Sequence, residues 1–269
     1  MSLPCVTDTA STQSKPAGFG LWLQYGENLL VSFALAAMMI LPLAEIVLRK
    51  TLHVGLVGSS AFVQHFTLAV GVLGGAIAAR EGRLLSLSTL AGLLKGKWKT
   101  AATIFSNSFA SAITVFLCVA SFQFVLSEKQ SGNKLAYDIP VWIIQTILPI
   151  GFALVTWRLI RHASEKWRGR AIAILLAGLF VWIASRPPFE PAKMVVPALI
   201  GLVIATVLGA PVFTTLGGAA LILFWGDGSP IASIPLDHYR LVTNPSLPAI
   251  PLFTLAGYFL AEEIGRAHV

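Results

Sequence analysis

The sequence predicts an all-α, polytopic transmembrane protein, and three observations support this fold class. Hydrophobic residues make up 56% of the 269 residues and charged residues only 12%, whereas soluble domains carry about 25% charged residues. Apolar runs recur along the chain, and several approach or exceed the length of about 20 residues that a spanning helix requires. The runs do not alternate in polarity as barrel strands would. A soluble helical protein would need more polar surface than this chain has.

Six apolar segments are expected to form the membrane part: Leu29–Leu48, Phe62–Ala79, Ala101–Leu126, Ile139–Ile160, Ala171–Ser185 and Met194–Leu223. Pro187 and Pro188 follow the fifth segment and cannot continue a regular helix. Within the sixth, Gly209-Ala-Pro211 is expected to break or turn the helix. A further stretch, Leu247–Leu260, contains Pro248 and Pro251 and predicts a kinked or re-entrant element.

These segments divide the chain into five parts. We expect a polar leader at 1–20, a four-helix membrane unit at 21–165, a linker transmembrane helix at 166–192, the start of a second membrane unit at 193–262, and a tail at 263–269. The leader lacks the apolar core of a cleaved signal peptide. Ile264–Val269 matches one reading frame of a sequencing adapter, so the second unit is expected to be truncated at its C-terminus.

Basic residues predict the orientation. The loop after the second segment carries Arg80, Arg83, Lys95, Lys97 and Lys99 against Glu81, and the loop after the fourth carries Arg158, Arg161, Lys166, Arg168 and Arg170 against Glu165. An excess of Lys and Arg marks the cytoplasmic side, which also places the N-terminus in the cytoplasm. Arg49 and Lys50, on the outer side in this arrangement, do not fit the rule.

The chemistry-bearing residues do not favour an enzyme. The five histidines have no metal-ligand spacing, and no nucleotide-binding or nucleophile motif occurs. The net charge of +7 comes from residues at the ends of apolar segments, where it orients helices in a membrane. We therefore expect no catalytic residue, no metal site, no cofactor and no nucleic-acid partner.

Several polar and small residues are candidates for contacts between helices or with a second unit. Glu45 and Arg49 stand four residues apart near the end of the first segment and can pair on one helix face. Arg80-Glu81 closes the second segment. Both pairs can also serve as simple interfacial anchors.

Small and hydroxylated residues suggest helix packing. Gly71 and Gly75 form a G-x-x-x-G pair, which lets helix backbones approach closely. That face can dock a partner helix or pack within the four-helix unit. The third segment carries a polar patch that must face protein, either for bonds between subunits or along a substrate path. The patch consists of Ser106, Asn107, Ser108, Ser111 and Thr114.

Two stretches together resemble one family. The first runs through Glu27-Asn28, Leu43-Ala-Glu45-Ile-Val-Leu-Arg49, Gly74-Gly-Ala-Ile-Ala-Ala-Arg80-Glu81-Gly82 and Leu148-Pro149-Ile-Gly151-Phe. It resembles the small four-helix component of tripartite ATP-independent periplasmic (TRAP) transporters. The second runs through Gly209-Ala-Pro211-Val and Leu247-Pro-Ala-Ile-Pro251-Leu-Phe253-Thr-Leu-Ala-Gly257. It resembles the start of the large component, and the linker helix between them fits a fused chain. The resemblance covers residues 20–262.

The resemblance implies a function. It implies a secondary importer in the bacterial inner membrane, in which a periplasmic substrate-binding protein delivers an organic anion such as a carboxylate. Import is usually coupled to sodium, and the small component braces the large one. The resemblance assigns Glu45, Gly71, Gly75 and Arg80 to bracing. Pro248, Pro251, Phe253 and Gly257 would mark the onset of the transport core, and the substrate and ion sites would follow beyond it.

Two other functions remain open at this point. The four-helix unit can act as a non-transporting scaffold or assembly subunit that braces a separate transporter protein. A membrane enzyme would need a convergent polar site, which the residues in hand do not supply.

Overall fold

The computed structural model describes residues 18–56, 58–86, 96–164, 166–186, 190–244, 253–254 and 256–261. Its elements are α1 (Gly18–Thr51), α2 (Ser59–Glu81), α3 (Lys97–Ser131), the 3-10 turn η1 (Ala136–Asp138), α4 (Val141–Gln145), α5 (Ile147–Ala163), α6 (Trp167–Ser185), α7 (Pro191–Val207), α8 (Val212–Gly226) and α9 (Ser233–Val242). The described residues contain no strand beyond isolated bridges. The all-α prediction is confirmed.

Five helices are long and apolar enough to cross a membrane: Trp22–Thr51, Ser59–Glu81, Lys97–Ser131, Val141–Ala163 and Trp167–Ser185. Each contains one of the first five expected segments or most of it, so the protein is a multi-pass membrane protein. The helices run beyond the apolar runs because a helix does not end where the hydrocarbon does. The leader expected at 1–20 therefore overlaps the first helix, because Gly18–Gly20 already belong to α1.

The sixth apolar segment is divided as predicted. Helix α7 ends at Val207 and α8 begins at Val212, while Gly209 adopts a φ of 106° that favours glycine. The two helices contain 17 and 15 residues, which gives about 25 Å and 22 Å. The backbone N–H of Val212 donates to the carbonyl oxygen of Leu85 at 2.9 Å. This bond ties the turn between α7 and α8 to the segment after α2.

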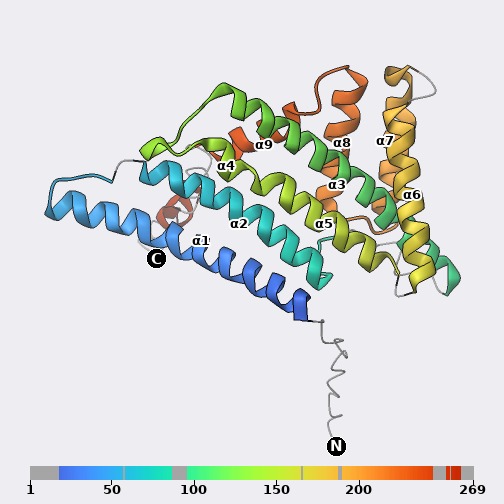
Figure 1. Cartoon of the computed structure of the whole chain (residues 1–269), viewed down its shortest axis with the longest axis horizontal. Helices are drawn as coiled ribbons and strands as arrows, with labels where there is room; N and C mark the ends of the chain where they lie inside the picture. The colour runs from blue at the N-terminus through green and yellow to red at the C-terminus, as the bar shows by residue number, and fades with distance from the viewer. Residues whose placement is uncertain are drawn as a thin grey trace, which may run out of the picture.

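Helix α3 lies at the centre of the molecule (Figure 1). It packs against α5 and α6, and also against α7, α8 and α9. Helix α2 packs on α5, and α1 lies along α2 at the edge of the bundle. In the most apolar stretch of α3 56% of the residues are buried, against 6% in α1. The central helix therefore joins the first four spans to α9 and to the hairpin formed by α7 and α8.

The polar patch of α3 faces protein, as predicted. Ser108, Ser111 and Thr114 are fully buried. Their hydroxyls donate to carbonyl oxygens three or four residues earlier in the same helix, and the Thr156 hydroxyl of α5 donates to that of Thr114 at 2.8 Å. The reading of the patch as an intersubunit surface is wrong, because helices of the same chain cover these side chains.

Close packing between α2 and α5 generates the first prediction. A Cβ atom at Gly151 would lie 2.0 Å from Cγ1 of Val72, whereas one at Gly71 would meet nothing within 4 Å. We expect Gly151→Leu to destabilise the protein by about 1–3 kcal/mol through overpacking. Gly71→Leu is the matched control, and its melting temperature in detergent should stay near that of the wild type. Equal melting temperatures for the two variants would contradict the observed α2–α5 contact.

Candidate functional site

One carboxylate and two guanidinium groups form a cluster at one end of the bundle, in which Glu27 and Arg158 are buried and Arg80 is half-buried. Glu27 of α1 is 4% exposed and accepts hydrogen bonds from Arg158 of α5 and Arg80 of α2. The Arg80 contact measures 3.3 Å. Arg158 also donates to the carbonyl oxygen of Ala76, and Arg80 donates to the side-chain oxygen of Asn28 at 3.1 Å. The cluster joins the first third of α1 to the last turns of α2 and α5.

The expected place of Arg158 in a cytoplasmic loop is wrong. Arg158 is 6% exposed and lies inside α5, on the face that carries Val155 and Leu159. A basic residue at the end of an apolar run ordinarily reaches toward the headgroups, but Glu27 of α1 and the carbonyl oxygen of Ala76 on α2 hold this one inside. A sequence feature that could have indicated the burial of Arg158 is Glu27, an acidic residue just before the first apolar segment. The remaining basic residues after α5 still outnumber the acidic ones.

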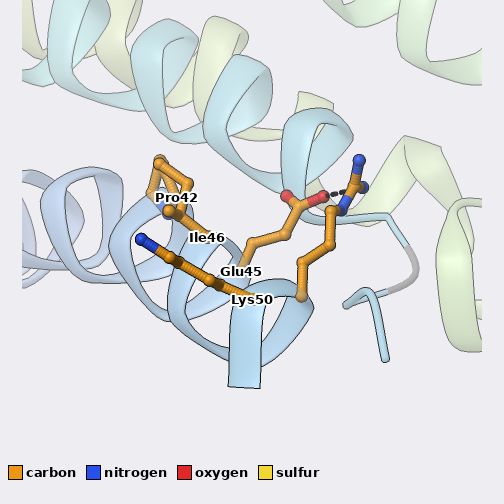
Figure 2. A pocket seen from close by; sticks show the side chains of 5 residues that line it. Pro42, Glu45, Ile46 and Lys50 are labelled. Carbon is orange, nitrogen blue, oxygen red and sulfur yellow. Dashed lines mark hydrogen bonds and ion pairs between the residues drawn. The ribbon is translucent and has the colours of Figure 1, made fainter. Parts of the chain in front are cut away.

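Glu45 and Arg49 pair as predicted, at 2.7 Å and four residues apart. The Arg49 side chain is 69% exposed, so solvent weakens the pair. An open groove of about 390 Å³ lies beside them, lined by Pro42, Glu45, Ile46, Arg49 and Lys50. Figure 2 shows the Lys50 side chain extending in the opposite direction from that of Glu45. The groove therefore presents both signs of charge without a cluster that could hold a metal.

A second groove places Glu45 near three helices. Pro42 and Glu45 also line this groove, together with residues of α2 and the segment that ends α9: Ser59, Ser60, Val63, Gln64, Thr67, Val242 and Asn244. Glu45 therefore lies where α1, α2 and the end of α9 meet. This supports the prediction that Glu45 contacts the second unit, which stays a prediction.

A hydrogen bond between His65 and Tyr239 was not foreseen from the sequence. His65 of α2 is buried, its Nδ1 lies 2.7 Å from the carbonyl oxygen of Ala61, and its Nε2 lies 2.8 Å from the Tyr239 hydroxyl of α9. A carbonyl can only accept, so Nδ1 carries a proton, and in the neutral imidazole Nε2 then accepts from Tyr239. An isolated histidine on an apolar helix gives no signal for such a distant partner.

The other candidate residues lie apart from one another. A Cβ atom at Gly71 or Gly75 would meet nothing within 4 Å, so this face does not mediate close packing among the described helices. Its docking role stays a prediction. Glu81 ends α2 and pairs with Arg80 at 3.8 Å and Arg83 at 3.7 Å.

The expected onset of the transport core is only partly described. Phe253 and Gly257 are exposed, and Pro248 and Pro251 lie outside the described residues. The tail at 263–269 lies outside them too. Within the part of the chain that the structure describes, no group of three His, Cys, Asp or Glu residues could hold a metal ion.

Comparisons with known proteins show what this chain is similar to. Residues 38–169 match the family model for the DctQ component of tripartite ATP-independent periplasmic transporters. A 133-residue stretch is 29% identical to the isethionate TRAP transporter permease protein DctMQ of Oleidesulfovibrio alaskensis. The match covers 46% of this chain and 20% of that protein. The chain thus spans about a fifth of the length of this curated relative.

The buried cluster generates the second prediction. Glu27→Gln would leave Arg158 without its carboxylate, and breaking a buried ion pair in this way costs about 3–5 kcal/mol. Glu45→Gln removes the carboxylate of an exposed pair, for which about 0–1 kcal/mol is expected. Thermal unfolding of both variants in the same detergent measures the difference. A Glu27→Gln variant as stable as Glu45→Gln would contradict a structural role for the cluster.

Proposed function

The chain belongs to the tripartite ATP-independent periplasmic (TRAP) transporters, and from this premise we propose that it is a membrane component of a sodium-coupled importer of organic anions. A periplasmic substrate-binding protein would deliver the anion. Isethionate, which names the relative, is a small sulfonate anion. We therefore propose organic anions as the substrate class, with carboxylates as one case among them. Transport rather than catalysis is the proposed activity.

The packing around α3 is the single observation that carries a bracing role for the first four spans. The DctQ match ends at residue 169, near the start of α6. Helices α7, α8 and α9 come after it and pack against α3. The buried charges of the first unit pair with one another, so they are not free to bind an anion. These features support a first unit that braces and a following unit that begins the transport part.

The paired charges favour a second candidate function. A unit whose buried charges, among the described residues, pair with one another can also serve as a non-transporting scaffold for a separate transporter protein. The two functions differ in one outcome, which is whether anion uptake occurs.

We further propose that the protein lies in the bacterial inner membrane with its N-terminus in the cytoplasm. The exposed basic residues Lys97 and Lys99 begin α3. At its other end Lys134 is balanced by Asp138, with 3.1 Å between the charged atoms. This distribution of Lys and Arg supports a cytoplasmic start of α3.

Cysteine labelling tests this orientation. Thr100 and Ser131 are exposed at opposite ends of α3. In a Cys5→Ser background, Ser131→Cys should react with a membrane-impermeant maleimide in intact cells. Thr100→Cys should react only after the membrane is permeabilised. The opposite pattern would reverse the proposed orientation.

Uptake tests the transport function. The protein encoded by the full reading frame of the gene would be reconstituted in proteoliposomes together with the secreted binding protein that we expect a neighbouring gene to encode. With isethionate and succinate as labelled probes, uptake of at least one should require an inward sodium gradient and the binding protein. A potassium gradient is the control. No uptake, combined with a stable complex with a separate large component, would favour the scaffold function.

A further inference from the structure

Two buried polar side chains make no hydrogen bond of ordinary geometry among the described residues. Gln145 ends α4 and is fully buried, and its amide oxygen and amide nitrogen make no hydrogen bond of ordinary geometry, only a weak contact with the Tyr239 side chain. Ser121 of α3 is fully buried as well, and its hydroxyl is also unpaired. Buried polar groups without a partner are costly and rare in native proteins. Each of these two groups therefore calls for a partner.

The helix register places the two side chains at one level of the bundle. The Cys118 thiol of α3 donates to the carbonyl oxygen of Pro149 at 3.3 Å, which fixes how α3 and α5 run past each other. The Thr114–Thr156 contact lies one turn earlier on α3 and two turns later on α5, which shows that the two helices are antiparallel. One turn onward from Cys118 is Ser121, and one turn back from Pro149 is Gln145.

The hydroxyl of Tyr239 belongs to the same place. Burial raises the pKa of this phenol, and a weak hydrogen bond with the Gln145 side chain, outside ordinary hydrogen-bond geometry, lowers it. Because Tyr239 donates its proton to Nε2 of His65, its oxygen can still accept a hydrogen bond. Three helices, α3, α4 and α9, therefore direct polar groups toward one small region.

The polar groups decide which ligand fits. The amide oxygen of Gln145 needs a donor and its amide nitrogen needs an acceptor. A cation would satisfy the oxygens but would meet the N–H groups of the amide, and an anion would meet the carbonyl dipole. Water donates and accepts in one molecule, and it is the usual partner of such buried groups.

We propose that Gln145, Ser121 and the Tyr239 hydroxyl form a buried water-binding site that joins α9 to the four-helix unit. Leu68, Phe124 and Leu148 form the apolar cluster around this level and shield it from lipid. The site does not depend on the proposed transport function, so failure of either proposal would leave the other standing.

X-ray radiolytic labelling of the full chain in detergent tests the site, with its own bound water as the probe. Hydroxyl radicals form from trapped water and modify the side chains next to it, which mass spectrometry detects. Leu148 is fully buried and Leu159 is 4% exposed, and both lie on α5, so Leu159 is the matched dry control. We expect faster modification of Leu148 and Phe124 than of Leu159. Equal rates in the wild type would overturn the proposal.

Variants make the assignment specific. Gln145→Leu and Ser121→Ala should each lower the labelling of Leu148 toward the level of Leu159. Thr114→Val removes another buried hydroxyl of α3 and should leave the labelling unchanged. If Gln145→Leu does not fold, Ser121→Ala and the comparison of Leu148 with Leu159 in the wild type still test the water-binding site. Unchanged labelling of Leu148 in the folded variants would overturn the site.

Discussion

The pairing of Arg158 with Glu27 is the interaction on which the arrangement of the first unit depends. A charged side chain inside the membrane is stable only when it is paired or reaches water, and both residues are buried. Their contact links α1 to α5, while Arg80 brings in the end of α2. Helix α1 has few buried residues of its own. Ordinary packing against α2 alone would leave its position weakly determined, so the ion pairs determine its place.

Helix α3 packs against neighbouring helices on several sides. Its buried face is built from alanines and hydroxyl residues such as Ala110, Ser111 and Thr114. Small side chains allow close approach, and hydroxyls bonded to their own helix need no outside partner. The helix can therefore pack against polar or apolar surfaces alike. Gln145 and Ser121 are the exception, because an amide cannot be satisfied by its own helix in this way and the serine hydroxyl remains unbonded.

What could be predicted from the sequence was local. Apolar length predicted the five spans, proline and glycine predicted the break before Val212, and the spacing of Glu45 and Arg49 predicted their pair. The interactions that determine the tertiary arrangement join residues far apart. Arg158 and Glu27 are separated by 131 positions, and Tyr239 and His65 by 174. Nothing in the neighbourhood of either residue distinguishes a buried partner from a side chain that reaches the membrane surface, so only the folded chain reveals the pairing.

The contacts of α2 bear on how a transporter built on this chain could move. The Tyr239 hydroxyl holds His65 in the first third of α2, and the backbone of Val212 is bonded to Leu85 just beyond its end. The hairpin and α9 are thus attached to the four-helix unit near both ends of one helix. Sliding them past it would break the backbone bond and the buried hydrogen bond together, and the loss of the buried one would leave polar groups unpaired in a low dielectric. In the transport proposal, α1 to α9 would therefore stay together as one static body during transport.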